Sequence, residues 1–506
     1  MPRTKHELMR ADIPLDRSSG VPLDRQIADG IIKAIEEGFL RPGDNLMPIR
    51  RIAAALGVAR ATVDAAYALL VSEGYIQTAR SRGSFVSVDL PVHALLEKTT
   101  EKRPAAVKPV SSHAALLTSA IIELMPQKNI PLAIVGTSPD ASPGKDFAAI
   151  LSRITRRSLL QIVYSHPSGL NELKTEICRI AGRLRGVRAR PEQVIVTSGS
   201  QLGLTLTLMA LFNAGDEVLL EDPGYPLLHG TAELFGLKPV WTPIDAEGLD
   251  LRTGLKAATN PRGVYLTPSH QCPLGMLMSL KRRREVLDWA EQSGAWVIED
   301  DYDSELRYGG NLPYPSLQGM DTGENVIYVG TFSKVLFPGL RLGYLIVPEK
   351  LTDLFSGLRL LIDRQGQELV QGAVAQFIRE GYYEPHLRHM RQIFEERRTY
   401  LLAACRREFG DWGEFSTGEQ SMHVVFNFHN QDIDDAAVQK LCLEEGVETR
   451  HLSSFYHQHA PRKGLVLGFG FFTESQILAA VSRIGYVLRH NFAAWGPQTK
   501  ASDCAS

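Results

Sequence analysis

The sequence predicts two folded units of different class, a small and mainly helical N-terminal unit and a large α/β unit with a largely parallel sheet. Three observations predict this division. Helical periodicity with a glycine-containing turn occupies the first 88 residues. A polar segment with three prolines follows at 89–112 and has the composition of a linker. From residue 113 onward, apolar strand-like runs alternate with helical patterns.

The composition is that of an ordinary globular chain. Its 506 residues exceed what one hydrophobic core usually serves, and 44% hydrophobic with 22% charged residues exclude a wholly disordered or collagen-like protein. The formal net charge is -2, so any surface for nucleic acid must be local. Five scattered cysteines without a C-x-x-C pair, and an N-terminus without an apolar leader, predict a cytoplasmic protein.

One uncharged stretch, 193–214, has the length of a membrane span. Several Ser, Thr and Gly residues interrupt it, which favours a buried strand, a loop and a buried helix over a span. We therefore expect no membrane partner.

Three helices are expected in the N-terminal unit. Residues 22–38 carry apolar side chains at helical spacing and end at Gly38. Residues 48–56 form a short helix with Pro48 in its first turn, and Gly57 supplies a tight turn into a further helix at 58–73. Helix, glycine turn and helix form the pattern of a helix-turn-helix.

Two short strands are expected next, at 74–76 and 84–88, around a tip at 79–83 that suits the wing of a winged helix. Between Pro48 and Val63 there are three arginines and no carboxylate. Arginines at helix starts and wing tips suit phosphates and base edges, although a solvated basic face on a small helical domain is the alternative. The candidate DNA-binding residues are Arg50, Arg51, Arg60, Thr62, Arg80 and Arg82.

This segment resembles the GntR-type winged-helix domain over nearly all of residues 20–88. The resemblance rests on PLDRQIADGIIKAIEEGFLRPGDNL, LGVARATVDAAYALL and EGYIQTARSRGSFV. It implies binding to operator DNA. Two positions depart from the pattern: Asp64 stands where a basic residue is commoner, and Ala59 replaces the usual hydroxyl residue before Arg60.

In the large unit, polar clusters follow the expected strands VIVTSG, EVLLED, GVYLTP, AWVIEDD, VIYVGTFS and GYLIVP. Ligands gather at the carboxyl ends of strands in such sheets. Residues 197–201 lie between a strand and a helix, which would point N–H groups at an anion. Tyr225 follows another strand and offers a ring for stacking. Taken singly, each feature has a commoner structural explanation: a structural turn for residues 197–201, and a core tyrosine in a turn for Tyr225.

The remaining two clusters contain charged groups that are costly to bury without a partner. Residues 296–302 end an apolar strand in three carboxylates and a phenol, without a His or Cys cluster at metal spacing. A protonated heterocyclic nitrogen is the better partner. Residues 329–334 end another strand in hydroxyls and Lys334, which is suited to Schiff-base chemistry, and Arg341 follows. Together these groups are what pyridoxal phosphate (PLP) needs.

Over residues 115–490 the chain resembles fold-type I PLP-dependent enzymes of the aminotransferase class I/II group. The motifs are TSGSQ, EDPGYP, TPSHQCPLG, VIEDDYDSE and GTFSKVLFPGLRLGY. With the winged helix, the whole chain resembles MocR-type regulators of the GntR family, which HLRHMRQIFEERR also fits. The expected domains are a winged helix at 20–88, a linker at 89–112 and an aminotransferase-like domain at 113–495, whose small subdomain is mainly 370–495.

The resemblance assigns the roles of individual residues. Lys334 would carry the cofactor as a Schiff base, Asp300 would pair with the pyridinium nitrogen, Tyr302 would bond the 3-hydroxyl and Tyr225 would stack on the ring. His270 and Gln271 would line the ring edge. The phosphate would be held by backbone at Gly199 and by Ser200, Gln201, Thr331, Ser333 and Arg341.

One departure concerns the effector. Relatives that grip a carboxylate have an arginine in a G-x-R-x-G-F stretch, whereas this chain has Val466 there. Arg450 or Arg462 could substitute, but an exposed arginine is the commoner case for each.

The family implies a homodimeric regulator that binds operator DNA and responds to PLP or to an amino-compound effector. An active aminotransferase with an accessory DNA-binding domain is the alternative, and a regulator that senses PLP itself is a third hypothesis.

Overall fold

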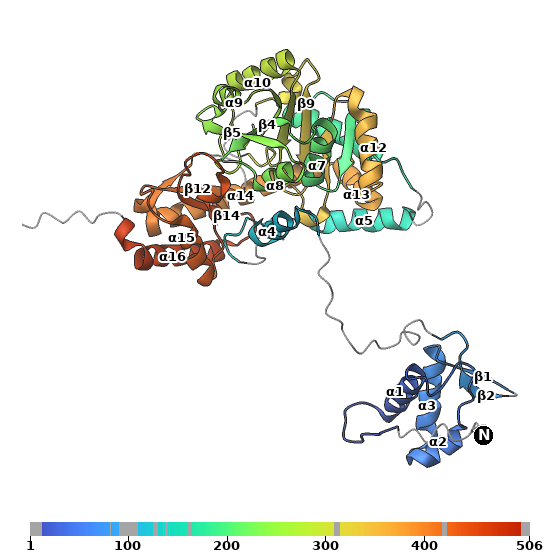
Figure 1. Ribbon diagram of the computed structural model, residues 1–506. Helices are drawn as coiled ribbons and strands as arrows, with labels where there is room; N and C mark the ends of the chain where they lie inside the picture. Colours follow the sequence, from blue (N-terminus) through green and yellow to red (C-terminus); the bar gives the residue numbers. More distant parts are fainter. Residues whose placement is uncertain are drawn as a thin grey trace, which may run out of the picture. The chain divides into compact units, whose positions relative to one another are not determined.

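The computed structural model describes residues 13–80, 82–90, 110–124, 130–134, 136, 140, 142–158, 164–307, 314–416 and 422–496. The chain divides into two compact units, Met1–Val110 and Ser111–Ser506 (Figure 1). Most of the predicted linker, 91–109, lies outside the described residues, and the finer domain boundaries given above stay predictions. No helix in the described part of the chain is both long and apolar enough to cross a membrane.

The N-terminal unit contains the three expected helices, α1 (Leu23–Glu36), α2 (Ile49–Leu56) and α3 (Arg60–Ser72). Their apolar faces meet in one core in which Ile27, Val63 and Leu70 are fully buried. Gly57 has φ +62, a left-handed conformation that favours glycine and lets α3 start at once after α2. The predicted helix-turn-helix is therefore confirmed.

The hairpin differs from the prediction by two residues at its start. Strand β1 (Ile76–Ala79) pairs antiparallel with β2 (Gly83–Val86), from Ile76 opposite Val86 to Ala79 opposite Gly83. The first strand was expected at 74, but the Tyr75 N–H still donates to Leu70 O at the end of α3. Residues 74 and 75 therefore belong to the end of α3, and the first strand starts at Ile76.

The large unit contains an eight-stranded sheet in the order β3-β10-β9-β8-β7-β4-β5-β6. Strands β4, β5, β7, β8 and β9 are parallel, while β10 is antiparallel to both its neighbours. The six runs predicted from the sequence are all strands, and β5 and β6 were not predicted. The strands are β3 (Val194–Thr197), β4 (Glu217–Asp222), β5 (Lys238–Asp245), β6 (Gly248–Leu249), β7 (Pro261–Leu266), β8 (Trp296–Asp301), β9 (Val326–Thr331) and β10 (Gly343–Ile346).

Helices bury the sheet on both faces, as parallel sheets require. Consecutive residues of β4 show this directly: Val218 and Leu220 pack in one core with α7 and α8, whereas Leu219 packs in another with α10. The uncharged stretch at 193–214 is the predicted buried strand, loop and helix. The helices of this region are α7 (Ser200–Leu211), α8 (Pro226–Leu234), α9 (Leu251–Ala257), α10 (Leu280–Ser293), α11 (Leu317–Met320) and α12 (Thr352–Ile362).

A smaller sheet of different construction follows. It is wholly antiparallel, in the order β11-β12-β14-β13, and packs against α14, α15 and α16 (Figure 1). Its strands are β11 (Gly413–Phe415), β12 (His423–Phe428), β13 (Arg450–His451) and β14 (Gly464–Gly468). The remaining helices are α4 (Ala114–Leu124), α5 (Gly144–Ser158), α6 (Asn171–Arg185), α13 (Glu368–Arg379), α14 (Tyr383–Phe409), α15 (Asp435–Glu444) and α16 (Glu474–Asn491). We call the four-stranded sheet together with α14, α15 and α16 the small subdomain. The part built around the eight-stranded sheet is called the large subdomain.

Candidate functional site

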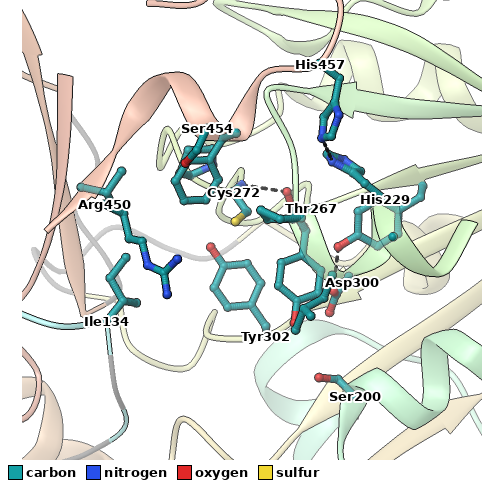
Figure 2. A pocket seen from close by; sticks show the side chains of 18 of the residues that line it. Ile134, Ser200, His229, Thr267, Cys272, Asp300, Tyr302, Arg450, Ser454 and His457 are labelled. Atoms are coloured by element: carbon teal, nitrogen blue, oxygen red, sulfur yellow. Dashed lines mark hydrogen bonds between the residues drawn. The ribbon is translucent and has the colours of Figure 1, made fainter. Parts of the chain in front are cut away.

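A cavity of about 1200 Å³ opens at the strand ends of the large sheet and is closed on one side by the small subdomain (Figure 2). Its lining is assembled from segments far apart in the sequence. Seven of the residues singled out from the sequence line it: Ser200, Tyr225, Asp300, Tyr302, Thr331, Ser333 and Lys334. The other five, Gly199, Gln201, His270, Gln271 and Arg341, lie outside the lining or directly behind it.

The N-terminus of α7 forms an anion cradle with Arg341. Gly199 precedes the helix with φ +92 and ψ 166, a conformation that is essentially reserved for glycine. A Cβ atom at Gly199 would lie 3.3 Å from the Arg341 guanidinium, and one at Gly343 would lie 2.8 Å from Ser200 N. Arg341 Nη2 also donates to Ser198 O at 3.1 Å. Helix N–H groups and a guanidinium thus converge where two glycines leave room, which suits a phosphate.

Gln201 serves this cradle differently from the prediction. Its side-chain amide donates to Thr231 Oγ1 at 2.9 Å, which ties α7 to α8. Gln201 lies in the first turn of α7, where backbone N–H groups have no partner within the helix. Its backbone N–H, and not its side chain, is therefore the group that can face an anion.

Asp300 is held at the end of β8 with one oxygen unpaired. The residue is 4% exposed, and its Oδ2 accepts a 2.8 Å bond from Tyr265 Oη. Its Oδ1 is buried without a hydrogen-bond partner among the described residues. Burial raises the pKa of this carboxyl to about 7, against the lowering effect of Tyr265. A cationic group that donates to Oδ1 would restore the ionised form, and a protonated ring nitrogen does both.

Tyr302 is fixed from behind by a buried polar chain. Its Oη lies 2.7 Å from His270 Nδ1, which in turn lies 3.0 Å from Asp303 Oδ2. Burial, reinforced by Asp303, raises the pKa of the Tyr302 phenol, which keeps it a hydrogen-bond donor. Gln271 instead holds a loop, since its amide donates to Pro223 O at 2.8 Å.

Lys334 enters the cavity three residues after β9 ends. Burial lowers the pKa of its amine, and Asp303 and Cys272 oppose this. A lowered pKa enlarges the neutral, nucleophilic fraction that attack on a carbonyl carbon requires. The local turn is fixed because the Ser333 N–H donates to Thr331 Oγ1 at 3.1 Å. The site therefore combines an anion cradle, a buried carboxylate, a phenol and an amine.

The small subdomain supplies one wall of the cavity. Arg450 of β13 and Val466 of β14 both line the cavity and are paired directly opposite each other. The expectation that Arg450 is a surface residue is wrong, because its side chain is only 20% exposed. Arg462 is exposed and lies outside the lining, as expected.

The carboxylate of Asp222 helps to fasten the small subdomain to the large subdomain. Asp222, at the end of β4, accepts from the backbone N–H groups of His457, Gln458 and His459 at 2.8, 3.0 and 2.8 Å. The His457 ring stacks on the Trp241 ring, with centroids 4.2 Å apart. It also lies within hydrogen-bond distance of His229 (Figure 2). The acidic residue was visible in the sequence, but its partners are more than 200 residues away. Within the described ranges, no cluster of three or more His, Cys, Asp or Glu residues could hold a metal ion.

In the N-terminal unit, the arginines selected from the sequence fall into two groups. Arg50, Arg51, Arg60 and Arg80 are exposed, and Thr62 is half-buried on α3. Arg82 is exposed too, but its guanidinium donates to Gly43 O and, at 2.9 Å, to Asn45 Oδ1, and lies over the Phe85 ring. Arg82 thus anchors the wing.

Sequence reasoning missed Arg17. Its Nη2 donates to Gly57 O at 2.8 Å, so an exposed guanidinium lies at the turn between α2 and α3. The segment before α1 is held there by Gln26, whose side chain bonds Asp16 O and Val21 O. Only this tertiary contact distinguishes Arg17 from any other surface arginine.

Comparisons with known proteins agree with both units. Residues 23–86 match the family of bacterial regulatory proteins of the gntR type, and residues 161–467 match aminotransferase class I and II. The α-aminoadipate aminotransferase LysN of Thermus thermophilus, solved with N-(5'-phosphopyridoxyl)-L-leucine, superposes with a TM-score of 0.67 at 26% identity, over 79% of this chain and 98% of LysN.

Full-length relatives carry both units together. The "Probable rhizopine catabolism regulatory protein MocR" of Rhizobium meliloti is 34% identical over 90% of this chain and 91% of its own length. The pyridoxine biosynthesis transcriptional regulator PdxR of Corynebacterium glutamicum is 29% identical over 94% of this chain and 98% of its own length. The winged helix, the aminotransferase fold and these relatives lead to one conclusion: this chain belongs to the MocR-type transcriptional regulators of the GntR family.

Proposed function

We propose that this regulator binds PLP in the cavity and reports its occupancy, or that of an amino compound bound with it, to a winged helix on operator DNA. The observation that carries the proposal is the buried Asp300 Oδ1, which lacks a partner in the same cavity as the Gly199–Arg341 cradle and Lys334. A ligand with a cationic ring nitrogen, a phosphate and an aldehyde satisfies all three.

Each residue of the site would bind a different part of the cofactor. Lys334 would attach to its aldehyde carbon through Schiff-base chemistry, Asp300 would pair with the ring nitrogen, and Tyr302 would donate to the 3-hydroxyl. Tyr225 would stack on the ring, and His270 and Gln271 would support the ring edge from behind. The phosphate would be held by Gly199, Ser200, Gln201, Thr331, Ser333 and Arg341. When bound, PLP supplies an electron-withdrawing ring that an amine can join.

Regulation requires that the ligand bind one arrangement of the protein better than another. A homodimer formed through the large unit would present two winged helices to paired half-sites. The residues that would face the DNA are Arg50, Arg51, Arg60, Thr62, Arg80 and Arg82. Arg17 would add a phosphate contact at the helix-turn-helix.

The test is the visible absorption spectrum of the purified full-length protein with and without PLP, for the wild type and Lys334→Ala. The wild type is expected to show a band that the variant lacks. The same samples are then titrated with DNA flanking the gene, and PLP is expected to change the affinity of the wild type only. If no band forms at any PLP concentration, the cofactor assignment is wrong.

An aminotransferase with an accessory DNA-binding unit is the second candidate. The set Lys334, Asp300 and Tyr302 lines one cavity, which favours it. A steady-state transamination assay on the PLP-loaded protein distinguishes the two, because sustained turnover with an oxo acid is expected only of an enzyme. A third hypothesis, that PLP itself is the signal, predicts a DNA response to PLP without any amine.

A further inference from the structure

We propose that the effector is a primary amine with an extended apolar chain, and that this chain lies in a groove along α8 while the amine reaches Lys334. The inference rests on the proposed function, because it places the effector beside the cofactor in the same cavity. It begins from the size of that cavity, about 1200 Å³. Pockets for drug-sized ligands measure about 300–1,000 Å³. PLP with a small amine is smaller than such ligands, so the cavity has room for a longer effector.

One face of α8 lines the groove along the whole helix. Pro226, Gly230 and Glu233 follow one another at intervals of four and three residues, which places them on the same side of α8. The lining begins at Tyr225, directly before the helix, and continues past its end to Gly236. A helix of nine residues is about 14 Å long. The groove therefore leads away from Tyr225, which is proposed to stack on the cofactor ring.

The groove is open at its middle, over Gly230. A Cβ atom added there would meet nothing within 4 Å outside the backbone of its own helix. The opposite side is formed by α4, which contacts α8 (Figure 1). Leu116 and Ser119, one turn apart on α4, both line the cavity. The space between the two helices can therefore hold a chain of methylene groups.

A further wall of the cavity is aromatic and uncharged near pH 7. It consists of Trp241 on β5, the His457 ring stacked on it, and His229. Burial, reinforced by His457, lowers the pKa of His229 to about 3. Burial also lowers the pKa of His457, against the effects of Asp222 and Glu233. Both imidazoles are therefore neutral, and an apolar chain is stabilised when it leaves water against these rings.

The charge of α8 disfavours an acidic end on this chain. Glu233 is exposed in the last turn of α8, and the helix contains no lysine or arginine. A carboxylate at the end of the effector would meet the like charge of Glu233. An amine with an uncharged chain end is therefore the better match.

The experiment uses the full-length protein loaded with PLP and follows its visible band during titration with methylamine, butylamine, hexylamine and octylamine. The exchange is redox-neutral, because one carbon–nitrogen bond forms as the bond to Lys334 breaks and the lysine leaves as a free amine. The wild type is expected to bind longer amines more tightly, by about two- to fourfold for each methylene group that leaves water. Free PLP, titrated in parallel, should show no such dependence on chain length. 6-Aminohexanoate should bind about tenfold more weakly than hexylamine.

Variants of the groove separate this binding from folding. Gly230→Leu fills the groove, so octylamine should bind no more tightly than methylamine. Gly230→Ala is the matched control, because it shares the gain in helix propensity but adds a single carbon, and it should keep most of the preference. Leu116→Ser should weaken octylamine binding about three- to tenfold. Leu117→Ser changes an exposed neighbour outside the lining and should behave as the wild type.

A wild type whose affinity does not rise with chain length would overturn the proposal, as would a Gly230→Leu protein that still prefers octylamine. Binding of 6-aminohexanoate as tight as that of hexylamine would also overturn it. If Gly230→Leu fails to bind PLP, the pair Leu116→Ser and Leu117→Ser decides, and equal affinities for octylamine would overturn the proposal. Absence of the PLP band in the wild type would instead refute the proposed function.

Discussion

The clearest physical prediction concerns Asp300 in the cofactor-free protein. Its pKa of about 7, against an ordinary 3.8, corresponds to about 4 kcal/mol at 1.36 kcal/mol per pKa unit. Below pH 3.8 the carboxyl is neutral in both the folded and the unfolded chain and contributes no difference. Between 3.8 and about 7 the unfolded chain releases a proton that the folded chain keeps, so the free energy of unfolding falls as pH rises, and above that the penalty is constant.

Replacement of Asp300 by Asn removes this titration. The cofactor-free variant should therefore match the wild type near pH 4 and exceed its free energy of unfolding by about 4 kcal/mol at pH 8. With PLP bound the order should reverse, because the carboxylate then has a cationic partner and the amide does not. Glu221, whose pKa burial raises to about 7 with a smaller contribution from Asp300, is present in both proteins, so most of its own titration cancels in the comparison.

The assay is guanidinium chloride unfolding of the full-length proteins at pH 4 to 8, followed by tryptophan fluorescence. All five tryptophans lie in the large unit, at 241, 289, 296, 412 and 495, so the signal reports that unit alone. If the free energies of unfolding of the wild type and Asp300→Asn show the same pH dependence without cofactor, Asp300 does not have a raised pKa in the folded protein. The argument for a ring nitrogen at this position would then be lost.

Three shorter predictions follow. Gly199→Ala forces a side chain onto a glycine-only conformation and 3.3 Å from the Arg341 guanidinium, so PLP affinity measured by absorbance should fall about 10- to 100-fold; unchanged affinity would rule out the cradle. Arg82→Ala should lower the melting temperature of the isolated winged-helix unit by several degrees, because the wing loses its anchor; an unchanged melting temperature with weaker DNA binding would make Arg82 a DNA contact instead. Asp64→Ala frees Arg60, whose Nε lies 3.9 Å from Asp64 Oδ2, and should raise DNA affinity up to about fivefold at low salt, as measured by fluorescence anisotropy; reduced affinity would show that Asp64 itself reads the operator.

Local patterns were enough to predict much of the fold. The helices of the N-terminal unit and six strands of the large sheet follow from periodicity, because buried apolar runs and glycine stops leave local traces. Strand β5 was missed because KPVWTPID mixes prolines and polar residues with its apolar ones. The reversal of β10 could not be predicted either, since the alternation of apolar residues is the same in both strand directions.

The residues of the site could also be predicted only where their role depends on the local sequence. Lys334 and Asp300 were found because their strands end in groups that are costly to bury without a partner. The burial of Arg450 and the anchoring contacts of Arg82 could not be predicted, because they depend on a register with Val466 and on a turn at residues 43–45, which lie far away in the chain. Tertiary pairing, and not residue type, decides whether an arginine is solvated, structural or directed at a ligand.

The reversed strand β10 has a consequence for the order in which the protein matures. Within the described sheet β3 pairs only with β10, which is inserted between β3 and β9. The Gly199 cradle needs both the end of β3 and Arg341 just before β10, so it cannot exist until the ribosome has passed residue 346. The core of the winged helix is complete within the first 90 residues. The core of the winged helix can therefore form before the cradle does, and the proposed cofactor binding would mark the completion of the large subdomain.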